Sequence, residues 1–390
     1  MTLLDSFKHY GSNGTHLCLT FSPMGPTSGA MFNRLPSELR PPPRVTDDPH
    51  MNGRYPFWMV KSMLRQILLG LDFLHSHGVA HGDLQPGNIL FSTKDLSKMT
   101  EKDLVLPELY RKVLTISFND KGEAAFYNKN PEPKLGYRNE GMPFGQVTPS
   151  VPYYLAVRTP LYKHTDLGPP IHVKISDFGG SFLISDPPRI LVTPISLRSP
   201  ELILRDRPSQ AQDIWSFGCL MFQFLTAVPL FSLLPRLWAS DEEIRVQRES
   251  GTVHVIREGR KREDIEETSE QKRGIDNDIN DSHVLQIAEY LGPLPPSFMA
   301  RYPRSSTYFD KKGEIVKYHI GETVPEMYGE GPPDTRSIEE KFDDRKGVDI
   351  SDEDSVAVKG LLRWILQIDP AKRRSAAEIL AHPWFVEDNA

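Results

Sequence analysis

Two short motifs carry side chains that together could transfer a phosphoryl group. The first, HGDLQPGN, runs from His81 to Asn88 and includes Asp83 and Gln85, and the second begins with Asp177 as DFG. Phosphoryl transfer needs a carboxylate that orients the attacking hydroxyl, and oxygen ligands for the Mg²⁺ that neutralises the phosphates. Asp83 can supply the carboxylate, and Asn88 and Asp177 can supply the ligands. Each motif alone is a weak signal, but the two in this order predict phosphotransfer chemistry.

The segments around these motifs predict the elements that position them. Apolar residues recur every three or four positions between residues 57 and 77, so we expect a helix with one buried face. Gly78 ends this helix directly before the first motif. Residues 89–91 and 172–175 are short apolar runs that predict strands. The apolar positions on the buried face of the helix are Met63, Ile67, Leu71 and Leu74.

Composition excludes several classes of protein. The 390 residues are 38% hydrophobic and 25% charged, which is too apolar for a disordered chain. The net charge of −6 argues against general nucleic-acid binding, and two cysteines are too few for a disulfide scaffold. The N-terminal residues form no long apolar stretch, so we expect no secretory signal. Residues 214–235 are uncharged and long enough to span a membrane, but polar residues and a proline within them favour a buried helix.

The remaining segments give weaker signals. Residues 92–170 are rich in Pro, Asn, Gly and charged residues, which predicts an insertion or a surface loop. Residues 241–281 carry many charges of both signs and predict a solvated or flexible segment. We also expect a strand at 16–21 and helices at 356–368 and 376–381.

The chain resembles the eukaryotic protein kinases, because the two motifs match the catalytic loop and the Asp-Phe-Gly motif of that family. Three more matches follow in the family's order: Arg198-Ser-Pro-Glu201, Asp213-Ile-Trp-Ser-Phe-Gly-Cys219, and Asp369-Pro-Ala-Lys-Arg373 with His382-Pro-Trp-Phe385. The resemblance implies an α+β protein kinase-like fold with a mostly helical large lobe and a truncated small β lobe. Residues 1–25 would be the remnant of the small lobe and the hinge. Residues 26–390 would be the large lobe, with inserts at about 92–170 and 236–350.

The resemblance also assigns a role to each motif residue. Asp83, Gln85 and Asn88 would be catalytic, and Asn88 and Asp177 would bind Mg²⁺. The structural residues would be His81, Phe178, Gly179, Arg198, Glu201, Asp213 and Arg373. Among these, Glu201 pairs with Arg373 in the family, and a histidine at position 81 would brace the loop against Phe178.

ATP would be the second cofactor, bound next to the hinge. In that placement, Phe21 closes the back of the nucleotide pocket, and the carbonyl of Ser22 and the N–H of Met24 meet adenine. Leu90 forms the apolar floor under the base, and Asp177 reaches the phosphates through the metal.

A finer resemblance is to the SR-protein kinases, particularly those of fungi. It rests on GTHLCLTFSPMG at 14–25, on TPISLRSPE at 193–201 and on the long insert in the large lobe. It implies a serine/threonine protein kinase with a basic, Arg/Ser-rich protein substrate, which an acidic surface would suit. We expect a monomer that contacts neither nucleic acid nor membrane. We expect a cytoplasmic location, and a nuclear one as well if the substrates are Arg/Ser-rich.

The sequence also departs from the family pattern. It contains no G-x-G-x-x-G, and no lysine other than Lys8 precedes the first predicted helix. The lysine and glutamate that pair and bind the phosphates of ATP in the family therefore do not occur here in the family's order. This predicts a fragment or a degenerate kinase. Gln85 stands where many kinases have lysine, so a neutral donor replaces a positive charge. Gly82 replaces the arginine that reads activation-loop phosphorylation, so we expect no activating phosphate at Thr193 or Ser196.

Three functions remain open from the sequence. An active serine/threonine kinase is favoured because Asp83, Asn88 and Asp177 are all present. A catalytically impaired pseudokinase or scaffold is favoured by the missing glycine-rich loop and lysine. A small-molecule phosphotransferase of the aminoglycoside or choline type shares His-Gly-Asp followed by Asn, but the Ser-Pro-Glu motif and the Asp213 helix argue against it.

Overall fold

The computed structural model describes residues 3–11, 14–32, 34–42, 54–100, 114–118, 124–128, 154–155, 161–233, 244–249, 252–257, 269–317 and 336–386. The chain divides into two compact units, one of residues 1–26 with 92–166 and the other of residues 27–91 with 167–390. The division into a small-lobe remnant and a large lobe with two inserts stays a prediction.

The first unit begins with a β-hairpin. β1 (Leu3–Gly11) and β2 (Gly14–Phe21) pair antiparallel, with Gly11 opposite Gly14. The strand predicted at 16–21 is part of β2, but the sequence does not predict β1, because LLDSFKHYG does not alternate apolar and polar residues. β3 (Met24–Thr27) follows and crosses the boundary between the units.

The first unit also holds a small antiparallel sheet inside the segment predicted to be a loop. β6 (Leu114–Phe118) lies between β7 (Ala124–Asn128) and β8 (Tyr154–Leu155). The sequence predicts an insertion or a surface loop over 92–170 but does not predict these strands. LTISF and AAFYN contain the β-branched and aromatic residues that favour strands, and the surrounding Pro, Asn and Gly residues hide this signal.

The second unit contains the elements that hold the two sequence motifs. α2 spans Phe57–Ser76, and His77 is its C-terminal cap. Gly78 follows with a φ of 72°, so the predicted helix is confirmed. β4 (Val79–Ala80) leads into the first motif and pairs with β10 (Phe182–Leu183), which follows the second. Four apolar residues are expected on the inner face of α2: Met63, Ile67, Leu71 and Leu74. All of them except Leu74 are buried, with an exposed fraction of at most 1%.

A second pair of strands brings the two motifs together. β5 (Ile89–Ser92) begins where the first motif ends, and β9 (Val173–Ile175) ends where the second motif begins. The strands pair antiparallel with Ile89 opposite Ile175. Because the strands run in opposite directions, the end of the first motif and the start of the second lie at the same end of the pair.

α5 (Ala211–Thr226) forms the centre of the second unit, as the uncharged run predicts. Only Ala211 and Gln223 among its residues are not buried. α10 (Asp352–Ile365) approaches it closely at Gly218, where an added Cβ would lie 2.6 Å from Cγ2 of Ile365.

Among the described residues, no helix has the length and hydropathy needed to cross a bilayer. Burial raises the pKa of the Cys219 thiol well above its ordinary value, so this cysteine packs as an apolar residue.

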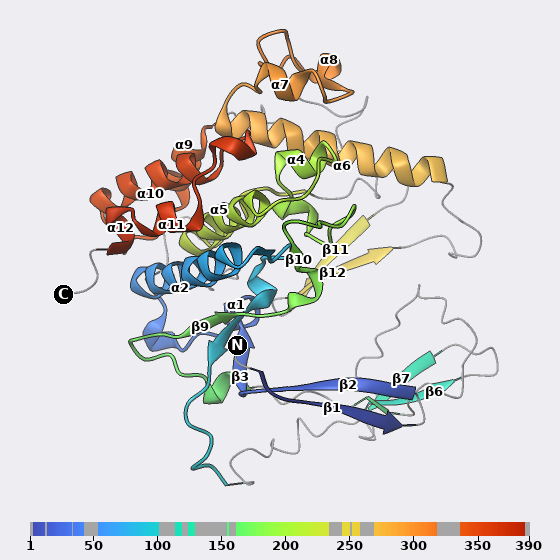
Figure 1. Ribbon diagram of the computed structural model, residues 1–390, viewed down its shortest axis with the longest axis vertical. Coiled ribbons are helices and arrows are strands. Elements are labelled where there is room, and N and C mark those ends of the chain that lie inside the picture. The colour runs from blue at the N-terminus through green and yellow to red at the C-terminus, as the bar shows by residue number, and fades with distance from the viewer. Residues whose placement is uncertain are drawn as a thin grey trace. The chain divides into compact units, whose positions relative to one another are not determined.

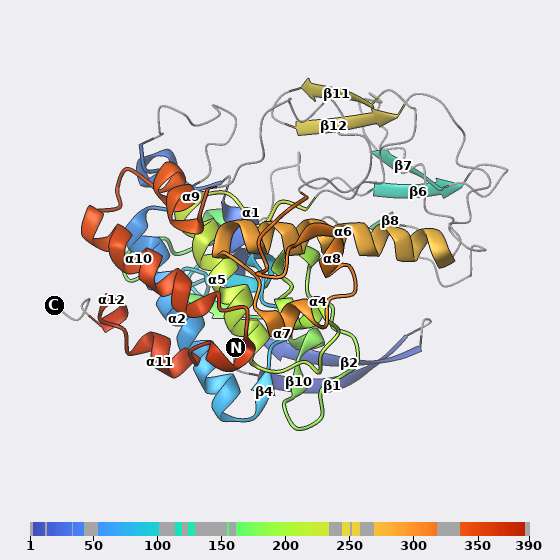
Figure 2. The same ribbon diagram turned by 90° about the horizontal axis from the view of Figure 1, so that it is seen from above.

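Helices of the C-terminal half complete the second unit and differ in part from expectation. α6 (Ser269–Leu291) begins inside the segment predicted to be flexible, and its apolar residues Val284 and Ile287 are fully buried. α9 (Ile338–Arg345) is also a helix that the sequence does not predict. The shorter helices are α1 (Ser28–Met31), α4 (Pro200–Ile203), α7 (Pro296–Met299), α8 (Ser305–Tyr308), α11 (Ala376–Leu380) and α12 (Pro383–Val386). The helices α9 to α12 gather on one side of the unit (Figure 1 and Figure 2), where α9 and α10 contact the C-terminal end of α6 through Lys341 and Arg363.

One more hairpin falls within the charged segment. β11 (Ile244–Glu249) pairs antiparallel with β12 (Thr252–Arg257). Its sequences, IRVQRE and TVHVIR, begin with an alternation of apolar and polar residues, which is the pattern of a strand exposed on one face. The high density of charge conceals this pattern, so the sequence does not predict these strands, and the solvated or flexible character expected for 241–281 stays a prediction.

Candidate active site

The carboxylate of Asp83 is held by two side-chain amides from its own loop. Nε2 of Gln85 lies 2.9 Å from both Oδ1 and Oδ2 of Asp83. Nδ2 of Asn88 donates to Oδ2 at 3.0 Å and to the backbone carbonyl of Asp83 at 2.8 Å. The structure therefore brings together the three residues predicted to be catalytic, with Asp83 half-buried at their centre.

The buried carboxylate of Asp213 anchors the loop to the core of the unit. Asp213 lies in the first turn of α5 and is 1% exposed. It accepts hydrogen bonds from the backbone N–H of His81 at 2.8 Å and of Gly82 at 2.9 Å. Nε2 of His75 on α2 lies 2.9 Å from the same carboxylate. One carboxylate thus joins α2, α5 and the loop directly before Asp83.

His81 connects the first motif to the second. Its Nε2 lies 3.0 Å from the carbonyl of Ser176, and its Nδ1 accepts the N–H of Asp83 at 3.2 Å. These bonds together require the hydrogen on Nε2, because a carbonyl can only accept. The ring of Phe178 meets the His81 ring edge-on, with centroids 5.4 Å apart. The contact between His81 and Phe178 that the resemblance implied is present in the structure.

Asn88 and Asp177 lie at the same end of the β5–β9 pair. The carbonyl of Asn88 accepts the backbone N–H of Ser176 at 2.8 Å and its hydroxyl at 2.9 Å. Asp177 follows Ser176 in the left-handed region, with a φ of 61°. Its Oδ1 accepts the N–H of Gly179 at 3.3 Å, so Gly179 helps to fix the aspartate side chain.

The donor set of these two residues fits Mg²⁺. Asn88 uses Nδ2 to hold Asp83, which leaves its amide oxygen for a cation, and Asp177 offers a carboxylate. Within the described residues, His, Cys, Asp and Glu form no cluster of three or more. Mg²⁺ needs no larger cluster, because it keeps several waters and is commonly held by one or two carboxylates and the phosphates of the nucleotide.

Thr193 holds the loop from the opposite side. Its hydroxyl donates to the carbonyl of Gly82 at 2.6 Å, and Thr193 is 3% exposed. Nε of Arg198 donates in turn to the carbonyl of Thr193 at 3.3 Å. A hydroxyl that is buried and hydrogen-bonded is poorly placed to be phosphorylated, which supports the expectation that Thr193 carries no activating phosphate.

Gly82 occupies a position that accepts no side chain, so we expect Gly82→Ala to unfold the loop. Its φ is 77°, and an added Cβ would lie 2.4 Å from the backbone oxygen of Gly180. A left-handed residue other than glycine costs about 1–2 kcal/mol before any clash. We expect a lower melting temperature and loss of any phosphotransfer.

The matched control for this change is Gly360→Ala. Gly360 lies inside α10 with nothing within 4 Å of an added Cβ. Because alanine is the better helix former, this substitution should stabilise the protein by about 0.5–1 kcal/mol. Equal melting temperatures for the two variants would contradict the assignment of Gly82.

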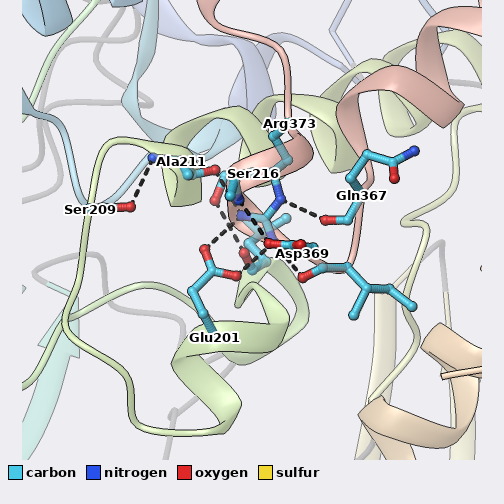
Figure 3. A network of polar contacts seen from close by, with 10 residues as sticks. Glu201, Ser209, Ala211, Ser216, Gln367, Asp369 and Arg373 are labelled. Atoms are coloured by element: carbon cyan, nitrogen blue, oxygen red, sulfur yellow. Dashed lines mark hydrogen bonds and ion pairs between the residues drawn. The ribbon is translucent and has the colours of Figure 1, made fainter. Parts of the chain in front are cut away.

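The predicted ion pair between Glu201 and Arg373 is present and fully enclosed. Nη1 and Nη2 of Arg373 each lie 2.6 Å from a different carboxylate oxygen of Glu201. Arg373 also donates to the carbonyls of Gln367 at 2.7 Å and Ala211 at 3.0 Å (Figure 3). The guanidinium lies 5.0 Å from the centre of the Trp215 ring. The arginine therefore ties α4, α5 and the loop after α10 together.

The residues predicted to bind adenine are divided between the two units. Phe21, Ser22 and Met24 belong to the first unit, and the half-buried Leu90 belongs to the second. The adenine site stays a prediction.

Three residues of the site are not predicted by the sequence. His75, Ser176 and Thr193 each make hydrogen bonds that fix the two motifs. His75 lies on the predicted helix but outside the two motifs, and Thr193 lies outside them as well. A signal for Thr193 exists in TPISLRSPE, since this threonine lies shortly before the Ser-Pro-Glu motif.

The sequence pattern of the protein kinase domain matches residues 34–104 and 163–385. The match covers more than half of the chain, which therefore belongs to the protein kinase family. The α+β protein kinase-like fold expected from the motifs is confirmed. The unmatched residues between the two parts, 105–162, lie within the first predicted insert.

Relatives support the finer resemblance as well. The chain is 26% identical over 389 residues to the serine/threonine-protein kinase SRPK of Physarum polycephalum, covering 99% of this chain and 70% of that protein. It is 23% identical to protein kinase dsk1 of Schizosaccharomyces pombe, with 99% and 69% covered. It is 22% identical to dual specificity protein kinase CLK1 of Mus musculus, with 81% and 48% covered. A solved kinase domain is 18% identical, with a TM-score of 0.47 over 98% of this chain and 76% of that one.

Proposed function

We propose that this protein kinase transfers the γ-phosphoryl group of ATP to a serine or threonine hydroxyl of a protein substrate. The observation that carries the proposal is the geometry of Asp83. Its carboxylate is fixed by Gln85 and Asn88, next to the oxygen donors of Asn88 and Asp177. A protein that acts only as a scaffold has no physical need for a fixed carboxylate next to two oxygen donors.

The hydrogen bonds at Asp83 indicate which oxygen would meet the substrate. Oδ2 accepts from both Gln85 and Asn88, whereas Oδ1 accepts only from Gln85 among the contacts that the structure shows. A carboxylate oxygen has two lone pairs, so Oδ1 has room for one more donor. In the proposed reaction, Oδ1 accepts the hydrogen bond of the substrate hydroxyl and takes its proton as the new bond to the γ-phosphorus forms. The bond from that phosphorus to the bridging oxygen of ATP breaks, and ADP leaves.

Asn88 and Asp177 would hold Mg²⁺ when the nucleotide is bound. The metal would supply charge neutralisation between the phosphate oxygens. The chain's own part is to keep both donors in place, through the bonds of Ser176 to the Asn88 carbonyl and of Gly179 to Asp177.

The relatives support a basic, Arg/Ser-rich protein as the substrate class. One is named SRPK, and the net charge of −6 gives this chain a mildly acidic balance that would attract basic segments. We further propose that the chain acts as a monomer in the cytoplasm, and in the nucleus where Arg/Ser-rich substrates are present.

A protein-binding pseudokinase is the second candidate. The observation in its favour is that the printed sequence has no G-x-G-x-x-G and only Lys8 before α2. The two candidates differ in outcome, because a pseudokinase binds partners without transferring phosphate.

Asp177→Ala should remove the Mg²⁺-dependent part of nucleotide binding. A ligand that binds only the folded state raises the melting temperature. We expect ATP with Mg²⁺ to raise the melting temperature of the unmodified chain and to have little effect on the variant, since one of two metal ligands is lost.

The matched control is Asp352→Ala, which removes a fully exposed carboxylate at the start of α10. It should respond to ATP and Mg²⁺ as the unmodified chain does. Transfer of labelled phosphate to an Arg/Ser peptide then separates kinase from pseudokinase. A folded chain that shows neither a Mg²⁺-dependent shift nor transfer contradicts the proposal.

A further inference from the structure

The amide of Gln85 has an unusual relation to the carboxylate beside it. Its Nε2 is 2.9 Å from Oδ1 and 2.9 Å from Oδ2 of Asp83. A nitrogen at equal distance from both oxygens lies in the plane that passes midway between them. The amide of Gln85 therefore donates to both oxygens of the carboxylate.

Asn88 fixes the same carboxylate from a second direction. Its Nδ2 contacts Oδ2 at 3.0 Å and the backbone carbonyl of Asp83 at 2.8 Å. Gln85 contacts both carboxylate oxygens, and Asn88 contacts Oδ2 alone. Together they oppose rotation about the last side-chain bond of Asp83, so both the position and the plane of the carboxylate are set. The hydrogen bonds that the structure shows to this carboxylate come from neutral amides.

We propose that Gln85 is a positioning residue for Asp83, which it orients through hydrogen bonds from its neutral amide. The inference rests on the proposed kinase function. The alternative is that Gln85 acts mainly as a contact to the transferred phosphate. The geometry favours orientation, because the Gln85 nitrogen already lies within hydrogen-bonding distance of both Asp83 oxygens.

The two roles predict different kinetics. A misplaced base slows the chemical step but leaves nucleotide binding intact, whereas a lost phosphate contact weakens binding of ATP. Gln85→Met keeps the length of the side chain and removes both donors. We expect its kcat to fall about tenfold or more with an unchanged KM for ATP. Gln85→Lys restores a donor that can reach both oxygens, so it should recover most of the kcat.

A second measurement tests the inference without relying on activity. A water-soluble carbodiimide with glycine ethyl ester labels carboxylates, and peptide mass spectrometry gives the rate at each one. Loss of the Gln85 hydrogen bond should raise the labelling rate of Asp83 several-fold in Gln85→Met. The exposed Asp95, which contacts Ser97 and Lys98 of its own turn, serves as the internal reference.

The outcomes separate the inference from the proposed function. If the unmodified chain transfers no phosphate, the proposed function fails, and labelling alone decides the role of Gln85. An unchanged Asp83 labelling rate in folded Gln85→Met overturns the inference, and so does a raised KM for ATP with an unchanged kcat. Gln85→Ala, which removes the same donors with less bulk, repeats both measurements in case the methionine variant folds poorly.

Discussion

Replacement of Asp83 by Asn should lower the rate of phosphoryl transfer by about 10²–10⁴-fold, the range for loss of a general base. The substitution keeps the size of the side chain but places an amide where a proton acceptor is needed. Nucleotide binding should change little, because Asn88 and Asp177 remain in place to hold the metal. Single-turnover transfer to an Arg/Ser peptide measures the first effect, and the Mg²⁺-dependent thermal shift measures the second.

The control for Asp83→Asn is the same change at Asp352, which is exposed and lies at the start of α10. It should leave both measurements unaltered. Normal turnover in Asp83→Asn would show that another group takes the substrate proton. Loss of the thermal shift in this variant would show that Asp83 acts on the nucleotide rather than on the acceptor.

The largest expected effect on stability is that of Glu201→Ala. The Arg373 side chain is 0% exposed, and Glu201 is the carboxylate that balances its charge. Removing one partner of a buried ion pair costs about 3–5 kcal/mol, because the remaining charge has no access to water. Chemical denaturation should show this loss of free energy of unfolding.

Two comparisons make this prediction specific. Glu201→Gln keeps hydrogen-bonding capacity without the charge, so we expect an intermediate loss. Asp344→Ala breaks the exposed pair between Asp344 and Arg336, which should cost less than about 1 kcal/mol. A Glu201→Ala variant as stable as Asp344→Ala would mean that the carbonyls of Gln367, Ala211 and Ile368 alone compensate for the charge of Arg373.

The motifs of the site could be predicted because their chemistry restricts the residue types. Asp83, Asn88 and Asp177 are fixed by what phosphoryl transfer requires, and the structure places them on one loop and at one end of one strand pair. α2 and α5 were predictable for another reason. Each contains a run of apolar residues that is too long for a loop, and each helix is buried as that run indicates.

The features that the sequence does not predict depend on tertiary contacts. α6 carries dense charge over its first half, and its buried residues Val284 and Ile287 occur only in the second. α9 buries Ile338 and Phe342, two residues that are too few to outweigh the charges around them. The bond from Thr193 to Gly82 joins residues far apart in the chain, so no local pattern could indicate it.

The single carboxylate of Asp213 couples the catalytic loop to the cooperative unfolding of the unit. It holds two backbone amides of the loop and the ring of His75 from inside the central helix. A loop anchored in this way cannot open as a separate low-energy fluctuation, because its opening would leave the buried carboxylate of Asp213 without two of its hydrogen bonds. Mobility needed for substrate exchange must therefore come from other segments. Heating should preserve the active geometry until the core itself melts.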